Sequence, residues 1–227
     1  MSPADRRVAL VTGGGRRIGA AICRAMAGAG FAVALSFRTS RREASRLARE
    51  IGGRAISLDI ARPASIDRAA LEVSRVFGRL DLLVHNAAVF PRTPAETLTP
   101  ADWDAVFAVN LRGPFLLTRA LLPLLREACG GVCFLGDAGA GRLWPAHLPY
   151  CLSKIALERQ AAAWRRMLSP GVRVGIVRPG LALRPEGFPR REWERLKARG
   201  DLRGPDSPGK IAAAVLRFAR SGRYTSS

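Results

Sequence analysis

The 227-residue chain has little lysine and little histidine. Only three of its 37 basic residues are lysines, so its formal net charge of +19 comes almost entirely from arginines spread along the chain. Proteins that bind nucleic acid specifically gather their basic residues on one element or face. The charge therefore indicates a compositional bias rather than a specific nucleic-acid site, although non-specific attraction to polyanions is expected at low salt.

Cysteine is also scarce, and long apolar runs are missing. The four cysteines form no C-x-x-C pair, and two histidines add little to any metal-binding cluster, so we expect reduced thiols and no metal site. No run of apolar residues reaches the roughly 18 needed to span a membrane, and Met1 to Arg7 lacks an apolar stretch of signal-peptide length. These absences predict a soluble, cytoplasmic protein that does not enter membranes.

What the chain does contain is a regular alternation of apolar and amphipathic segments. Short apolar segments, typical of buried parallel strands, lie at 8–11, 31–37, 54–58, 80–84, 131–135 and 172–177. Helical patterns follow them, with no repeat, linker or second hydrophobic unit. The alternation predicts an α/β fold with one domain over residues 1–227, a Rossmann-like doubly wound parallel sheet. Residues 183–208 are rich in Pro, Gly and Arg, and we expect them to form a lid with a short helix near 189–199.

A glycine-rich turn joins the first strand to the first helix. Gly13, Gly15 and Gly19 stand in Thr12-Gly13-Gly14-Gly15-Arg16-Arg17-Ile18-Gly19, between the strand at 8–11 and the helical pattern at 20–29. Glycines let the backbone approach a pyrophosphate, and the helix N-terminus presents free N–H groups to it. A plain tight turn would use the same residues, so the motif alone leaves both interpretations open.

The residues after the second strand indicate which dinucleotide fits. An acidic residue there would bind the ribose 2′-hydroxyl of NAD, and an arginine suits the 2′-phosphate of NADP. The sequence has Arg38, Thr39 and Ser40 and no acid; Arg38 can bind a phosphate through two hydrogen bonds. We predict NADP, against the alternative of a solvated arginine. After the third strand, Asp59 and Ile60 could lie near an adenine, or Asp59 could cap a turn.

Polar residues recur later in the chain at positions where chemistry is possible. Tyr150 and Lys154 are four residues apart in a helical pattern, so they share one face of a helix. Chance alone often supplies that spacing. Asp137 ends the fifth strand thirteen residues earlier, and Asn110 interrupts an apolar stretch, where a polar group needs a partner or a role.

Taken in order, these motifs resemble the short-chain dehydrogenase/reductase family over nearly the whole chain. The resemblance rests on the glycine turn, His85-Asn86-Ala87-Ala88, Asn110, Tyr150 with Lys154, and Arg178-Pro179-Gly180. It implies that Tyr150 donates a proton beside the carbon that receives a hydride from NADPH. Lys154 would bind the nicotinamide ribose and, with the positive cofactor ring, lower the tyrosine pKa from about 10. Asn110 would hold a water in a proton relay.

The same resemblance implies cofactor contacts and an assembly. The cofactor would be held by Gly13, Arg16, Arg17, Ile18, Gly19, Arg38, Thr39, Ser40, Asp59, Ile60, Asn86, Ala87, Ala88, Tyr150, Lys154, Pro179, Gly180 and Leu181. Family members commonly form homo-dimers or homo-tetramers through the helices at 111–126 and 150–168. They usually have a seventh strand after a Tyr-x-Thr-Gly segment. Because this sequence stops at Arg223-Tyr224-Thr225-Ser226-Ser227, we expect six strands and an exposed sheet edge.

A narrower resemblance is to the pteridine reductases. It is carried by the Arg-Ile-Gly end of the turn, Arg38, Phe90, Pro179-Gly180-Leu181, and Asp137 at a position where most of the wider family has serine. In those enzymes the residues corresponding to Arg17 and Phe90 help hold a pterin. An ionised Asp137 would repel a carbonyl oxygen but suits an N-heterocycle; a protonated one could supply a proton to a ring nitrogen, and it should titrate together with Tyr150.

We therefore predict NADPH-dependent reduction of a C=N bond in a dihydropterin or dihydrofolate-like small-molecule substrate. The predicted catalytic residues are Asp137, Tyr150, Lys154 and Asn110, and the predicted substrate contacts are Arg17, Phe90, Asp137 and Tyr150. Alternatives stay open. The chain could reduce a carbonyl such as a 3-oxoacyl or sugar group, serve as a non-catalytic NADP-binding sensor or scaffold, or bind nucleic acid. Phe90 could be a packed loop aromatic, Arg17 a solvated helix start and Asp137 a loop cap.

Overall fold

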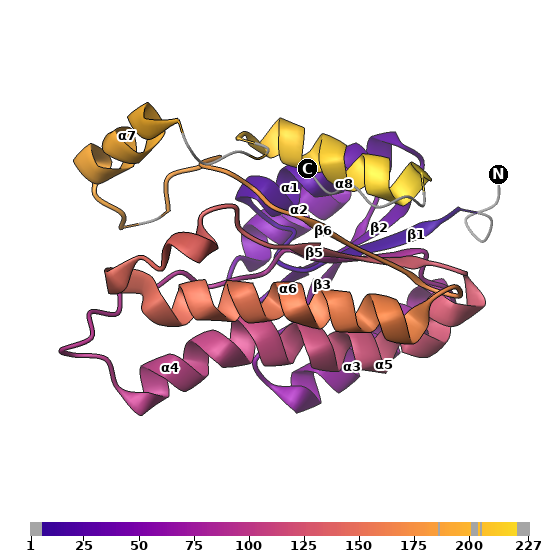
Figure 1. Ribbon diagram of the computed structural model, residues 1–227. Helices are drawn as coiled ribbons and strands as arrows, with labels where there is room; N and C mark the ends of the chain where they lie inside the picture. The colour runs from indigo at the N-terminus through magenta and orange to yellow at the C-terminus, as the bar shows by residue number, and fades with distance from the viewer. Residues whose placement is uncertain (1–5, 186, 201–203, 205, 222–227) are drawn as a thin grey trace.

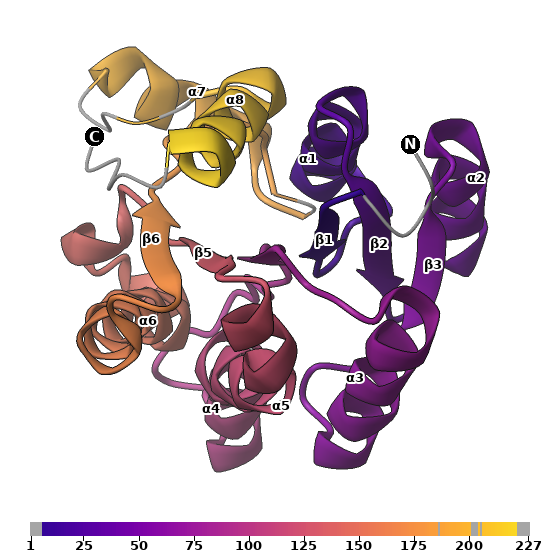
Figure 2. The same ribbon diagram turned by 90° about the vertical axis from the view of Figure 1, so that its right-hand side faces the viewer.

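The computed structural model describes residues 6–185, 187–200, 204 and 206–221. Within them, six parallel strands form one sheet in the order β3-β2-β1-β4-β5-β6 (Figure 2). The strands are β1 (Val8–Val11), β2 (Ala32–Phe37), β3 (Arg54–Ser57), β4 (Leu82–His85), β5 (Gly131–Leu135) and β6 (Arg173–Val177). The order reverses between β1 and β4, which confirms the predicted doubly wound sheet of six strands. Residues 223–227, where the missing seventh strand was inferred, lie outside the described part.

Helices cover both faces of this sheet (Figure 1). One face carries α3 (Pro63–Phe77), α4 (Pro100–Phe107), α5 (Gly113–Glu127) and α6 (Leu148–Leu168), and the other carries α1 (Arg17–Gly28), α2 (Arg41–Ile51) and α8 (Pro208–Ser221). Successive strand residues point to opposite faces. In β1, Val8 and Leu10 accordingly join the core under one helical layer, and Ala9 and Val11 join the core under the other. Burial on both faces explains why the strands are continuous apolar runs.

The segment expected to form a lid contains α7 (Arg190–Arg199), close to the predicted 189–199. It stands apart from both helical layers, beyond the carboxyl ends of the strands (Figure 1). Trp193 is the buried residue of this helix, and its ring meets Phe188 edge-on, with 6.2 Å between ring centroids. This aromatic contact anchors an otherwise polar helix over the end of the sheet where the strands terminate.

One helical stretch, Pro100–Glu127, is long and apolar enough by composition to cross a membrane. It comprises α4, α5 and the π-helical segment η2 (Ala108–Arg112) between them. Leu117, Leu121 and Leu125 of α5 are completely or almost completely buried in the core beneath the sheet. Packing in this core accounts for the apolar composition of the stretch.

Candidate active site

A cavity of about 560 Å³ opens at the carboxyl ends of β1 to β4. Open α/β sheets bind their ligands at this point, where the strand order reverses. The cavity is lined by fifteen residues that the sequence had singled out: Gly13, Arg16, Arg17, Ile18, Gly19, Arg38, Thr39, Ser40, Asp59, Ile60, Asn86, Ala87, Ala88, Phe90 and Tyr150. The fold therefore brings together five separate sequence segments that were assigned to the cofactor and the substrate: 13–19, 38–40, 59–60, 86–90 and Tyr150.

The glycine turn is fixed by contacts that leave no room for side chains. Gly13 has a φ of +62°, and its N–H donates to Ser36 Oγ at 3.2 Å. The Asn86 side-chain amide donates to the carbonyl oxygens of Thr12 at 2.8 Å and Gly13 at 3.2 Å. A Cβ placed on Gly19 would lie 2.2 Å from the Gly13 carbonyl oxygen. The turn therefore needs glycine at position 19, where the first helix packs directly on the strand-to-helix connection.

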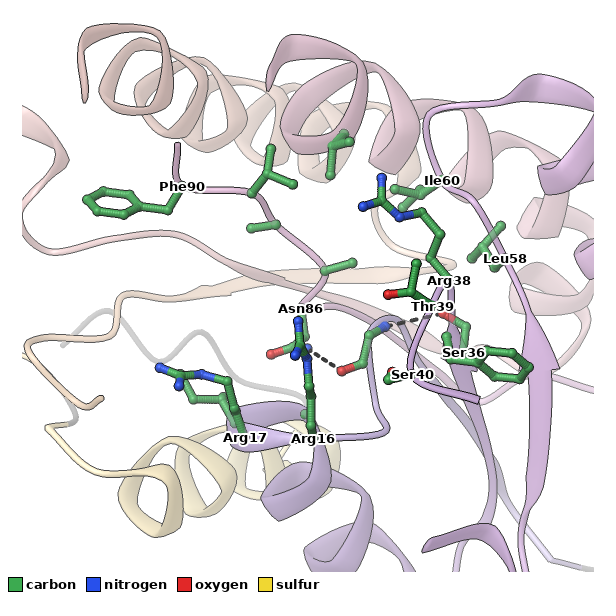
Figure 3. A pocket seen from close by; sticks show the side chains of 18 of the residues that line it. Arg16, Arg17, Ser36, Arg38, Thr39, Ser40, Leu58, Ile60, Asn86 and Phe90 are labelled. Atoms are coloured by element: carbon green, nitrogen blue, oxygen red, sulfur yellow. Dashed lines mark hydrogen bonds between the residues drawn. The ribbon is translucent and has the colours of Figure 1, made fainter. Parts of the chain in front are cut away.

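The two ends of the cavity differ in chemistry. Figure 3 places Arg38, Thr39 and Ser40 at one end and Phe90 at the other, with Arg16 and Asn86 between them. A guanidinium beside two hydroxyls is a suitable site for a phosphate group, because both kinds of group donate hydrogen bonds to its oxygens. The cavity is thus polar and basic at one end and aromatic at the other.

Asp59 makes the turn contact that one of its two predicted roles requires, and its place beside an adenine stays a prediction. Its carboxylate lines the cavity and also accepts a hydrogen bond from the Ala61 N–H at 3.1 Å. The Arg62 Nε lies 3.4 Å from the other carboxylate oxygen. Asp59 therefore stabilises the turn after β3 and at the same time presents a polar edge to the cavity.

A smaller cavity of about 180 Å³ adjoins the first at its aromatic end. It shares Ile18, Asn86, Ala88, Phe90 and Tyr150 with the larger cavity, and it adds Asp137, Lys154 and the Pro179-Gly180-Leu181 loop that follows β6. Every predicted site residue except Asn110 lines one of the two cavities. Three aromatic residues of the smaller cavity, Trp144, Phe188 and Trp193, were not predicted.

Tyr150 and Asp137 are hydrogen-bonded to each other inside the smaller cavity. The Tyr150 hydroxyl donates to Asp137 Oδ2 at 2.5 Å, and Asp137 Oδ1 accepts from the Gly139 N–H at 2.6 Å. Asp137 thus caps its loop, as one alternative proposed, and also contacts the candidate proton donor. Burial, and then the negative charge of Asp137, raise the pKa of Tyr150 well above its usual value.

Lys154 lies one helical turn from Tyr150 and is 4% exposed. Its Nζ donates to the Leu135 carbonyl oxygen at 2.8 Å. Burial lowers the pKa of Lys154 to about 8, partly offset by the carboxylates of Asp137 and Glu158. The predicted lowering of the tyrosine pKa by Lys154 together with the positive ring of a bound cofactor stays a prediction. The ammonium lies 5.8 Å from the centroid of the tyrosine ring, while Asp137 contacts the hydroxyl directly.

Asn110 sits in the π-helical segment between α4 and α5 and is 1% exposed. Its side-chain oxygen accepts from the Val89 N–H at 2.9 Å, and its amide donates to the Val89 carbonyl and to Ser153 Oγ, both at 3.0 Å. Asn110 therefore connects the loop after β4 to the helix that carries Tyr150. These contacts give Asn110 a positioning role. The water relay that the family resemblance implies for Asn110 stays a prediction.

Phe90 and Arg17 both make contacts beyond the cavity wall. The Phe90 ring stacks on His147, with centroids 4.1 Å apart, and meets the Tyr150 ring edge-on at 4.4 Å. It is therefore a packed loop aromatic and a cavity-lining residue at once. Arg17 donates to the Arg184 carbonyl oxygen at 2.7 Å, which connects the glycine turn to the segment that leads into α7.

Comparison with known proteins agrees with this geometry. The family model Enoyl-(Acyl carrier protein) reductase matches residues 14–220. D-threitol dehydrogenase of Mycolicibacterium smegmatis is 36% identical over 95% of this chain and 86% of its own length. The chain belongs to the short-chain dehydrogenase/reductase family. It is therefore an oxidoreductase by family.

Two further proteins are similar to this chain over almost its whole length. Galactitol 2-dehydrogenase of Agrobacterium fabrum is 31% identical over 97% of this chain and 85% of its own length. A short-chain dehydrogenase from Burkholderia cenocepacia J2315, solved in complex with NADP, matches with a TM-score of 0.85 and 32% identity over 96% of this chain and 94% of that one. The two relatives named by activity are polyol dehydrogenases, so they support the family but not the narrower resemblance to pteridine reductases.

Proposed function

We propose that the protein is an NADPH-dependent reductase of a small carbonyl compound, with the corresponding alcohol as product. The observation that carries this proposal is the continuous pair of cavities, which runs from the basic group at Arg38 to the phenol of Tyr150. The relatives named for threitol and galactitol oxidation support the carbonyl–alcohol pair as substrate class. The relative solved with NADP supports the cofactor.

The residues of the two cavities have separate tasks in this proposal. NADPH, when bound, supplies the hydride. Arg38, with Thr39 and Ser40, would hold the 2′-phosphate, and the N–H groups at the start of α1 would bind the pyrophosphate. Tyr150 gives its proton to the carbonyl oxygen as the hydride arrives, and Lys154 binds the ribose and stabilises the tyrosinate left behind. The raised pKa of Tyr150 keeps the phenol protonated at neutral pH, which favours reduction over alcohol oxidation.

A second candidate function is reduction of a C=N bond in a dihydropterin. The observation that favours it is the Asp137 carboxylate at the Tyr150 hydroxyl. A ring N–H can donate to this carboxylate, whereas a carbonyl oxygen that gains negative charge is repelled by it. The Phe90 ring at the same end of the cavity offers a flat surface for a heterocycle.

Initial rates of NADPH oxidation with a substrate panel test the proposed function. The panel contains erythrulose and other small ketoses, a 3-oxoacyl thioester, and 7,8-dihydrobiopterin. We expect turnover of at least one carbonyl compound in the presence of NADPH. Turnover of the dihydropterin without any carbonyl turnover would overturn the carbonyl assignment in favour of the second candidate. Turnover of neither would contradict both.

Replacing Arg38 tests the cofactor assignment. The Arg38→Ala variant should raise KM for NADPH by about 10- to 100-fold and leave KM for NADH within about threefold, because only NADPH carries the 2′-phosphate that a guanidinium binds. Arg42→Ala is the matched control, since Arg42 is exposed on α2 and does not line the cavity. Equal effects on the two cofactors would argue against recognition of the 2′-phosphate.

The proposal also covers the domain, the lid segment and the oligomeric state of the protein. We infer a single catalytic domain over residues 1–227, with 183–208 acting as the lid over the smaller cavity; Phe188 and Trp193, which line that cavity, support this. A homo-dimer or homo-tetramer through α5 and α6 is supported by the half-exposed ring of Phe115, stacked on Trp164 at 5.2 Å, and by Met167, which is 60% exposed. The cytoplasmic location stays a prediction.

A further inference from the structure

The smaller cavity is enclosed by aromatic rings from three parts of the chain. Phe90 follows β4, Trp144 precedes α6, and Phe188 and Trp193 belong to the lid segment. The rings contact one another: Phe90 meets Trp144 at 5.8 Å and Phe188 at 6.1 Å between centroids. Phe188 in turn meets Trp193 at 6.2 Å. These four residues, with the ring of Tyr150, form what we call the aromatic cage.

One carboxylate faces this aromatic cage. Among the described residues that line the smaller cavity, Asp137 and Lys154 carry the ionisable charges. The Lys154 ammonium is hydrogen-bonded to the backbone carbonyl of Leu135. Burial lowers the pKa of Lys154 to about 8, so it stays mostly protonated at neutral pH and offsets part of the Asp137 charge. The Asp137 carboxylate accepts from Tyr150 and Gly139, and two carboxylate oxygens offer about four acceptor positions, so it can accept further contacts.

Aromatic faces together with a carboxylate attract organic cations. The face of an aromatic ring is electronegative and draws a positive charge placed over it, most strongly in tryptophan. A carboxylate in the same partly desolvated cavity adds a direct Coulombic attraction. A neutral carbonyl compound gains neither the cation–π nor the Coulombic attraction, and the negative charge that develops on its oxygen is opposed by Asp137.

We propose that this site reduces cyclic iminium ions, which the aromatic cage and Asp137 bind as flat organic cations. The inference deepens the proposed function, because it rests on the same NADPH-dependent hydride transfer. The hydride from NADPH forms a C–H bond at the iminium carbon, and the π electron pair of the C=N bond moves to nitrogen. The substrate is reduced to a neutral amine and NADPH is oxidised to NADP⁺. The positive charge passes from the substrate to the nicotinamide, and no proton is consumed.

This balance separates the roles of Tyr150 and Asp137. A ketone must receive a proton on oxygen, so its reduction depends on the Tyr150 hydroxyl. An N-alkyl iminium ion receives no proton, so its reduction depends on Asp137 and the aromatic cage instead. The two reactions in one cavity should therefore respond oppositely to replacement of these two residues.

The test uses N-methyl-3,4-dihydroisoquinolinium, which is charged at every pH, and 2-tetralone, a neutral ketone of similar shape. NADPH oxidation is followed with each, and the rate without protein is subtracted. We expect the wild type to reduce the iminium ion. Asp137→Asn should lower kcat/KM for the iminium at least tenfold and raise kcat/KM for the ketone, because it removes the negative charge that opposes the developing charge on the carbonyl oxygen. Tyr150→Phe should lower ketone turnover at least 100-fold while iminium turnover falls less than tenfold. Asp104→Asn, an exposed aspartate on α4, is the matched control.

Each outcome decides between the proposals. NADPH oxidation with a carbonyl compound but not with the iminium ion overturns this inference and leaves the proposed function standing. Oxidation with the iminium ion alone supports the inference and overturns the carbonyl function, and oxidation with neither overturns both. Equal losses for both substrates in Asp137→Asn contradict the cation-binding role. NADPH affinity and thermal unfolding of each variant show whether a loss of activity arises from misfolding. If Asp137→Asn misfolds, the Trp193→Leu variant, which removes part of the aromatic cage, replaces it. Trp193→Leu must then lower turnover of the iminium ion more than that of the ketone, or the inference fails.

Discussion

The Tyr150→Phe variant is expected to reduce carbonyl compounds about 10²- to 10⁴-fold more slowly than the wild type, which is the usual contribution of a positioned acid. The ring stays in place, so its edge-on contact with Phe90 persists, and only the hydroxyl that donates to Asp137 is lost. The loss should fall on kcat, because the proton is transferred in the transition state. Initial rates over a range of ketone and NADPH concentrations measure it.

The control for this variant is cofactor binding. Tyr150 lines the larger cavity and the variant keeps its ring, so the affinity for NADPH should change less than threefold. Near-wild-type kcat in Tyr150→Phe would refute the proton-donor role. A large loss of NADPH affinity with unchanged kcat would instead assign Tyr150 to cofactor binding alone.

The Gly19→Ala variant is expected to lose NADPH binding and stability together. The added methyl group would lie 2.2 Å from the Gly13 carbonyl oxygen and 2.8 Å from the Asn86 side-chain nitrogen. Since Gly13 belongs to the glycine turn and Asn86 is hydrogen-bonded to it, relief of the overlap must move the backbone of the turn. We expect unfolding to become easier by about 1–3 kcal/mol, as for other overpacked sites, and KM for NADPH to rise at least tenfold. Denaturant unfolding and initial rates give the two values.

Gly28→Ala is the matched control for this substitution. Gly28 lies at the end of the same helix α1, and a Cβ there meets nothing within 4 Å. Alanine in a helix is more favourable than glycine by roughly 0.5–1 kcal/mol, so this variant should be as stable as the wild type or more so. Equal stability and equal NADPH affinity in the two variants would contradict the tight packing of the turn.

The sequence alone predicted the sheet and most of the cavity wall, for identifiable physical reasons. Strands buried on both faces produce continuous apolar runs, and their carboxyl ends must meet at one edge of the sheet. Arg38 and Asn86 follow a strand directly and Gly13 follows one after a single residue, so their convergence followed from topology. The interruption at Asn110 was visible because a polar residue inside an apolar helix needs partners, and Val89 and Ser153 supply them.

The features that the sequence did not predict depend on contacts between distant segments. Trp144, Phe188 and Trp193 lie in loops and in the lid, where no periodic pattern indicates which way a side chain points. Their aromatic character inside polar segments was the available signal. The raised pKa of Tyr150 also depends on such contacts, because it arises first from burial and then from the charge of Asp137, which accepts the tyrosine hydroxyl.

Equilibrium titration of the wild-type protein with NADPH and with NADH tests the central claim most directly. Trp144 and Trp193 line the smaller cavity, so their emission overlaps with the absorption of reduced nicotinamide bound nearby, and energy transfer reports binding. The account predicts saturable binding of one NADPH per chain, at least tenfold tighter than NADH. Absence of saturable NADPH binding, or equal affinity for the two cofactors, would contradict it.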